Sequence, residues 1–109
     1  MQKGTSIPTV ARLWHGRTTA SMADEYAAHI YEEGVKKLRS TKGNLGVQVF
    51  RQIHEGIAEF ITVSYWESLD VIRGYAGENI EKPRDLSKDP QYLLEIEPTV
   101  KHFDILFSE

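Results

Sequence analysis

A few arginine, tryptophan and histidine side chains in this sequence could do chemistry, and three of them lie close together near the start. Arg12 and Trp14 are two residues apart, so in a strand they share one face, whereas His15 points to the other face. A bulge would be needed to bring Trp14 and His15 into one pocket. Either Trp14 packs in the core and His15 is a surface or interface histidine, or both belong to a binding site.

Arg12 raises a question of charge. A guanidinium buried on a sheet needs a carboxylate partner or an anionic ligand, because burial removes the water that would otherwise stabilise its charge. Three acidic residues could pair with it, namely Glu59, Glu97 and Asp104.

Three further residues are candidates for a site, each with a structural alternative. Trp66 ends a strand pattern, either as a core residue at the strand–helix junction or as a wall that stacks on a flat aromatic ligand. His102 lies between Lys101 and Phe103 in a strand, either hydrogen-bonded in the core or poised in a pocket as a base. Asn44 either shapes a turn or orients a substrate oxygen.

Several functional classes are not expected. The four histidines show no paired metal-ligand spacing, so we expect no metal site. No glycine-rich phosphate loop is present, and we expect no nucleotide or other cofactor. The net charge of −3 argues against nucleic acid, and no apolar run is long enough to span a membrane. The absence of cysteine fits a reducing cytoplasm.

The elements that must position these side chains follow from periodicity. The 109 residues fit a single domain, with a polar lead-in at 1–8 and a structured core at 9–107. Alternating apolar residues predict strands at 9–17, 45–53, 57–66 and 99–107.

Two helices are predicted between these strands. Apolar residues at helical spacing predict the first over residues 21–33, with Gly34 in a left-handed conformation after it and a short extra turn at 35–38. A second helix begins at Ser68 and ends near Gly77. Residues 84–98 form a polar segment with a small apolar group.

The order strand, helix, strand, strand, helix, strand is the split βαβ pattern of an α+β, ferredoxin-like fold. It places both helices on one face of a four-stranded antiparallel sheet. The other face still carries apolar residues, which a second copy of the chain would cover. We therefore expect a homodimer.

At Trp66 the sequence resembles a known family. The stretch 59–68, which contains Trp66-Glu67-Ser68, and the later Tyr75-Ala76-Gly77 are similar to the antibiotic biosynthesis monooxygenase superfamily, in which a hydrophobic strand ends in W-x-S before a helix. Three other segments resemble a mostly uncharacterised branch of it, at 11–18, 43–46 and 97–103.

This resemblance implies a homodimeric α/β barrel with a ligand cleft between the sheet and the helices of each subunit. Known enzymes of the family include cofactor-independent oxygenases of polycyclic phenols and haem-degrading oxygenases, and both use a tryptophan that matches Trp66. The haem enzymes also need a histidine where Ala76 stands here, and an asparagine on the first strand, which residues 9–17 lack. Haem degradation of that type is therefore not expected.

The resemblance favours a cofactor-independent monooxygenase that acts on a small aromatic or phenolic molecule. His102 or His15 would be the base, Arg12 the anion stabiliser, and Trp14 and Trp66 the walls of one cleft. Two alternatives stay open, which are a non-catalytic dimer that binds a small hydrophobic ligand and a structural dimer with both tryptophans in its core. A pocket that contains a histidine of perturbed pKa would favour the enzyme.

Overall fold

A computed structural model describes residues 7–84, 86, 89–95 and 97–109, so most of the predicted lead-in and part of the segment 84–98 lie outside the described residues. Its centre is a four-stranded antiparallel sheet with the strand order β2-β3-β1-β4. The strands are β1 Val10–Thr19, β2 Asn44–His54, β3 Ile57–Trp66 and β4 Lys101–Asp104. The predicted ferredoxin-like α+β fold is confirmed.

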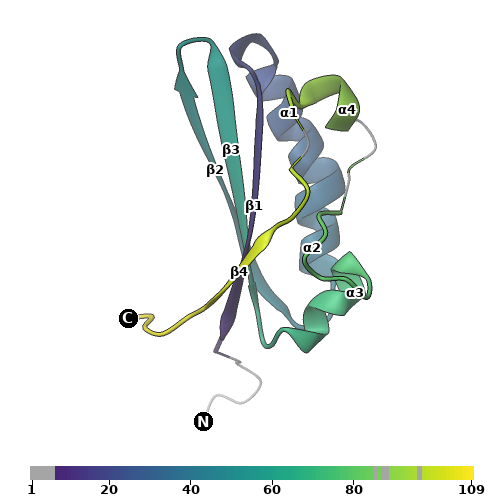
Figure 1. The fold of residues 1–109 in the computed structure, drawn as a ribbon. Coiled ribbons are helices and arrows are strands. Elements are labelled where there is room, and N and C mark those ends of the chain that lie inside the picture. The colour runs from purple at the N-terminus through teal and green to yellow at the C-terminus, as the bar shows by residue number, and fades with distance from the viewer. Residues whose placement is uncertain (1–6, 85, 87–88, 96) are drawn as a thin grey trace.

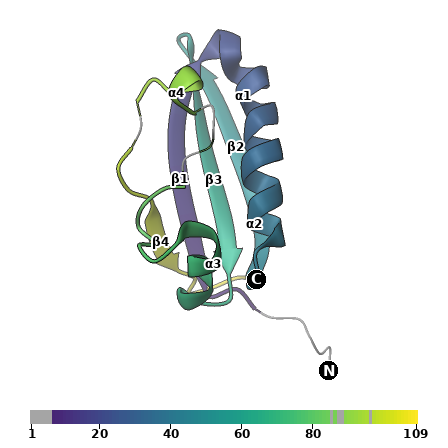
Figure 2. The same ribbon diagram turned by 90° about the vertical axis from the view of Figure 1, so that its right-hand side faces the viewer.

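The helices all lie on one side of this sheet, which Figure 1 views nearly edge-on. Between β1 and β2 the chain forms consecutive helical pieces, which are a 3₁₀ turn Ala20–Met22, α1 Ala23–His29, a π-helical segment Ile30–Val35 and α2 Lys36–Ser40. After β3 come a 3₁₀ turn Asp70–Ile72, α3 Arg73–Ala76 and α4 Asp89–Tyr92. Figure 2 shows α1 and α2 as one continuous rod along the strands, and we call the helical run over residues 20–40 the long helix.

The prediction that Gly34 ends the first helix in a left-handed conformation is wrong. Gly34 lies inside the π-helical segment, and it is not among the glycines with positive φ. There the amide of Lys36 donates to the carbonyl of Tyr31, five residues earlier, so the wider turn absorbs a residue and the helix continues to Ser40. Gly77, with a φ of 88°, does end α3 as predicted.

The register of β1 and β3 decides which side chains share a face. Arg12 pairs with Ser64 and Trp14 with Thr62, so these side chains point toward the helices. The residues of β3 alternate strictly between buried and half-buried, as the sequence pattern predicts. The residues that alternate with Arg12 and Trp14 along β1, such as His15, point to the face without helices.

The core under the helices is divided into two apolar clusters. The first packs around Tyr26 and Phe60 and includes Ile30 and Tyr92. The second packs around Trp66 and Ile72 and consists of Val10, Leu38, Trp66, Ile72 and Tyr75. Between the clusters, the sheet presents the polar side chains of Arg12, Thr62 and Ser64. The interior of the domain is therefore interrupted by a polar zone in its middle.

The opposite face of the sheet carries no helix in the part of the chain that the structure describes (Figure 1). It exposes large apolar side chains, among them Phe50 and Phe103, each about half exposed. β4 is shorter than predicted, and the following residues run as an extended tail with Phe107 exposed. No helix among the described residues is long and apolar enough to cross a membrane.

Candidate functional site

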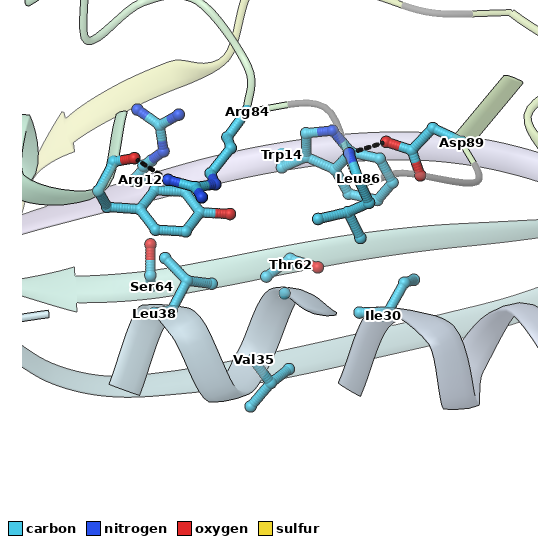
Figure 3. A pocket seen from close by; sticks show the side chains of 12 residues that line it. Arg12, Trp14, Ile30, Val35, Leu38, Thr62, Ser64, Arg84, Leu86 and Asp89 are labelled. Atoms are coloured by element: carbon cyan, nitrogen blue, oxygen red, sulfur yellow. Dashed lines mark hydrogen bonds between the residues drawn. The ribbon is translucent and has the colours of Figure 1, made fainter. Parts of the chain in front are cut away.

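A cavity lies between the two core clusters, enclosed by the sheet on one side and the helices on the other. Its volume is about 40 Å³, which is room for roughly three water molecules. The residues that line it come from β1, β3, the long helix and the segments after β3 (Figure 3); they are Arg12, Trp14, Ile30, Gly34, Val35, Leu38, Thr62, Ser64, Tyr75, Arg84, Leu86 and Asp89.

The π-helical segment helps to keep this space open. Gly34 faces the cavity, and a Cβ atom placed there would lie 3.6 Å from the Cδ1 atom of Leu86, an ordinary van der Waals contact. Any larger side chain at this position would enter the cavity. π-Helical turns inside α-helices occur frequently at functional sites.

Arg12 is the most deeply buried cation of the cavity wall, with only 4% of its surface exposed. Its Nη1 donates to the carbonyl of Ile80, and its Nη2 donates to the carbonyl of Lys82 at 3.2 Å. Burial lowers the pKa of Arg12, although nearby Tyr75 opposes the shift. Arg12 still keeps its charge at neutral pH, because an arginine guanidinium is effectively always protonated.

None of the predicted carboxylate partners bonds to Arg12. Among the described residues its hydrogen bonds go to two carbonyl groups and to His102, whereas Glu59 and Glu97 both bond to His15. A buried cation satisfied only by neutral groups leaves a positive potential in the cavity. This arrangement favours an anionic ligand.

His102 lies behind Arg12 on the same face of the sheet, since the two residues pair in register. The Nε2 atom of His102 is 3.2 Å from Nη1 of Arg12. A guanidinium can only donate, so Nε2 is the acceptor and the imidazole is neutral with its proton on Nδ1. Burial, and then the charge of Arg12, lower the pKa of His102. His102 does not line the cavity, so its contact with the site runs through Arg12.

Tyr75 and Arg84 complete the cationic end of the cavity. The guanidinium carbons of Arg12 and Arg84 lie 5.8 and 5.2 Å from the centre of the Tyr75 ring, so both cations contact this ring. Arg84 also donates to the carbonyl of Tyr75 at 2.9 Å. Sequence patterns place Tyr75 only on the apolar face of a helix and do not single out Arg84, because the contacts of both residues with Arg12 are tertiary.

A buried carboxylate marks the other end. Figure 3 shows Arg12 and Arg84 near one end of the cavity and Asp89 near the other, with Trp14 and Leu86 between them. Asp89 accepts hydrogen bonds from the hydroxyl of Tyr26 and from the amide of Leu86, both at 2.9 Å. These bonds tie the segment after α3 to the long helix.

The two tryptophans occupy different places. Trp14 lines the cavity, and its ring lies over Gly16, where a Cβ atom would come within 2.5 Å of it. Trp66 is fully buried beside the cavity, and its Nε1 donates to the hydroxyl of Ser64 at 2.8 Å. Ser64 itself lines the cavity, so Trp66 supports the wall without forming it.

Two other predicted site residues lie outside the cavity. Asn44 begins β2, and its side-chain oxygen accepts from Arg39 at 2.9 Å. His15 points to the open face, where its two ring nitrogens contact Glu97 and, at 2.7 Å, Glu59. Burial disfavours the charged form of His15, but the bonds from both carboxylates outweigh it and raise its pKa. No described group of three or more acidic or histidine side chains is arranged to bind a metal.

Fold and cavity together define a small α+β domain with a cavity between its sheet and its helices, charged at both ends. Several chains of known structure share this fold. A Bacillus cereus protein to which antibiotic biosynthesis monooxygenase activity is ascribed is 14% identical, with a TM-score of 0.63 and coverage of 94% of this chain and 96% of that one. A Nitrosomonas europaea protein of unknown function is 8% identical, with a TM-score of 0.65 and 96% coverage of both chains.

A third structure is the haem-degrading protein MhuD from Mycobacterium tuberculosis, which holds two haems in its active site. It is 13% identical, with a TM-score of 0.58 and coverage of 92% of this chain and 98% of that one. No family model and no curated protein matches the sequence. The resemblance to the antibiotic biosynthesis monooxygenases is therefore confirmed at the level of the fold.

Proposed function

We propose that the cavity binds a small aromatic molecule through an anionic oxygen, and that the protein oxidises this molecule with O₂ as a cofactor-independent monooxygenase. The observation that carries the proposal is the charge of Arg12, which is buried at the cavity with only neutral partners among the described residues. The neighbour from Bacillus cereus, with its ascribed monooxygenase activity, supports the class of reaction.

The volume of the cavity supports a small substrate. A cavity of about 40 Å³ is far below the roughly 300 Å³ or more of pockets that enclose drug-sized ligands. A carboxylate or phenolate head group fits this space, a single ring enters only if side chains of the wall move outward, and a polycyclic molecule would need a larger rearrangement. The flat face of Trp14 suits contact with a single aromatic ring.

In the proposed reaction a phenol binds as its phenolate, because Arg12 favours the anion, and the phenolic proton passes to solvent. The phenolate gives one electron to O₂, and the resulting superoxide combines with the ring radical to form a hydroperoxide. Loss of water from the hydroperoxide yields a quinone. Phenol and O₂ thus give quinone and water, so the substrate supplies all four electrons and no other reductant is needed.

The proposed roles follow the placement of the side chains. Arg12 faces the oxyanion, and Trp14 forms the wall for the ring. His102 holds Arg12 in place through its Nε2, which is therefore occupied and not offered as the base. Trp66 supports the wall through Ser64, while His15 is separated from the cavity by the sheet.

We also propose that a second copy of the chain covers the open face of the sheet. Apolar side chains such as Phe50 and Phe103 are about half exposed there, and a soluble monomer rarely leaves such a face bare. Sedimentation equilibrium tests this, with a dimer as the expected species. An Ile61→Lys variant places a charge at the centre of that face and is expected to be monomeric.

The location is proposed from the sequence alone. The chain has no cysteine, which suits a reducing compartment, and we propose the cytoplasm. Fractionation of cells that express the protein, followed by immunodetection, tests this. Recovery in a secreted or membrane fraction would contradict it.

The activity test measures O₂ consumption by the purified protein with a panel of single-ring phenols. We expect uptake by the wild type, its loss in Arg12→Gln, and its retention in His15→Gln, which changes a histidine on the other side of the sheet. With ¹⁸O₂, one labelled atom should appear in the quinone and one in water. Circular dichroism of each variant shows whether it is folded, and Arg12→Lys keeps the charge if Arg12→Gln does not fold.

The same experiment distinguishes the two candidate functions, an enzyme and a non-catalytic binding protein. Binding of phenols that depends on Arg12, without any O₂ uptake across the panel, would indicate a non-catalytic protein that holds a small ligand. No binding and no uptake would contradict both functions.

A further inference from the structure

The hydroxyl of Tyr75 has no hydrogen-bond partner among the described residues, although the side chain is 8% exposed and lines the cavity. Other buried tyrosines of the same region are satisfied, since Tyr26 donates to Asp89 and Tyr92 donates to Glu25. Among the described side chains, one polar atom is both closed off from solvent and without a hydrogen-bond partner, and this atom is Nε2 of His29. The hydroxyl of Tyr75, which has no partner among the described residues, is not closed off in this way, so water or a ligand can reach it.

The surroundings of Tyr75 are cationic. Arg12 and Arg84 both contact its ring, at 5.8 and 5.2 Å from the ring centre. Burial raises the pKa of Tyr75, and the two guanidinium groups reduce that rise without reversing it. The phenol consequently keeps its proton at neutral pH and can donate a hydrogen bond.

We propose that Tyr75 donates this hydrogen bond to the oxyanion of the ligand, and that Arg12 and Tyr75 together select single-ring aromatic molecules carrying a carboxylate or phenolate oxygen. This inference rests on the proposed function, because it assumes that an anion enters the cavity. It adds a residue to the site and a chemical class to the ligand. A neutral donor next to a buried cation binds an oxyanion more specifically than the cation alone, because a ligand without the acceptor leaves the donor unpaired.

The size of the cavity limits the ligand further. Arg12 lies at one end of a space of about 40 Å³ in Figure 3, and the ring of Tyr75 contacts its guanidinium, so little room separates the oxyanion from the ring that carries it. The first ring already lies against Trp14 and Leu86, which lie between the two ends in Figure 3, and a second fused ring would have to displace these side chains further. We therefore expect benzoate to bind more tightly than 1-naphthoate.

The test uses 4-nitrophenol, whose phenolate is yellow and whose phenol is not, so the absorbance reports the ionisation state of the bound probe. With the wild type, bound 4-nitrophenol should stay ionised at a lower pH than the free probe. Benzoate should displace it, and its own affinity should be independent of pH near neutrality because it is always an anion there. These two arms distinguish phenolate from carboxylate binding at the same site.

Tyr75→Phe removes only the hydroxyl and is expected to weaken binding of both probes by about tenfold or more, the effect of losing a hydrogen bond to a charged group. It should also move the pH at which bound 4-nitrophenol ionises back toward that of the free probe. Tyr31→Phe is the matched control, since Tyr31 is 53% exposed on the long helix and does not line the cavity. Its binding should equal that of the wild type.

The outcomes are separable. If Arg12→Gln abolishes binding of the phenolate but Tyr75→Phe leaves affinity and absorbance unchanged, the role of Tyr75 is overturned while the proposed function stands. If neither probe binds the wild type, the proposed function and this inference both fail. If the phenol form of the probe binds as well as the phenolate, the selection of an oxyanion is contradicted.

Discussion

The two faces of β1 treat their charged side chains in opposite ways. On the face under the helices, Arg12 is buried and bonds to two carbonyl groups and to a neutral imidazole. Three residues later and on the other face, His15 is half-buried between two carboxylates, Glu59 and Glu97. Among the described residues, one strand therefore carries a cation with no carboxylate bonded to it and an imidazole with two.

This difference indicates which face is prepared for a ligand. Two carboxylates already contact His15 and raise its pKa, so this cluster is satisfied within the protein. Among the described residues no carboxylate bonds to Arg12, which lies beside a cavity with Trp14 and Leu86 between its ends (Figure 3). Alternation along a strand, a property of the backbone alone, thus puts the proposed binding site and the proposed dimer interface on opposite faces.

The largest expected effect tests whether the face under the helices is the core. Phe60→Ala should lower the free energy of unfolding by about 3–5 kcal/mol, because Phe60 is 1% exposed and its loss leaves a void. Ile61→Ala, one residue on and facing the other way, should cost about 1 kcal/mol or less in the monomer. Urea unfolding of both variants measures this. A cost for Ile61→Ala that grows with protein concentration would show that a partner covers the face.

The second prediction contrasts the two sites directly. Arg12→Gln should weaken binding of benzoate at least about 30-fold, since it removes the buried charge that pairs with the anion. His15→Gln should change the affinity by less than about twofold, the ordinary effect of a substitution away from the site. Isothermal titration calorimetry gives both values. Equal losses in the two variants would refute the distinction between the faces.

The third prediction concerns pH, because the pKa shifts of the two histidines have opposite signs. The raised pKa of His15 contributes stability that is fully present below its ordinary value of 6.5 and disappears as the pH rises through the folded value. The lowered pKa of His102 contributes stability that is present above 6.5 and is lost as the pH falls.

Thermal unfolding between about pH 5 and pH 9 measures these contributions as differences from the wild type. The deficit of His15→Gln should be larger at the acidic end. For His102→Gln it should be larger at the alkaline end. Deficits that do not change with pH would contradict the two assigned environments.

The smallest effect concerns the long helix. Gly34 has helical backbone angles, so Gly34→Ala should raise the free energy of unfolding by about 0.5–1 kcal/mol. The new methyl group enters the cavity, and binding of benzoate should weaken at the same time. Gain of stability with loss of affinity would show that the glycine is kept for the cavity. Gain of stability with unchanged affinity would place the ligand elsewhere.

Much of the fold could be predicted because it rests on local patterns. The bounds of β3 match the prediction, and those of β1 and β2 differ by one or two residues, since alternation marks them clearly. The predicted range of β4 is too long because the alternating pattern extends beyond residues 101–104, which are the ones that pair with β1. The π-helical segment was missed because nothing in the local composition distinguishes a glycine inside a wide turn from one that ends a helix.

Less of the site could be predicted, for a physical reason. Arg12 and Trp14 stand out because they lie on one strand face, and periodicity places them together. Tyr75, Arg84 and Asp89 come from segments after β3, and only tertiary packing brings them to the same cavity. The carbonyl groups that satisfy Arg12 carry no signal in the sequence at all.

A crystal structure of the protein grown with benzoate tests the central claim most directly. The account predicts that the carboxylate lies within hydrogen-bond distance of the Arg12 guanidinium, in the cavity between the sheet and the helices. Benzoate on the open face near His15, or a cavity left without it at saturating concentration, would contradict the account.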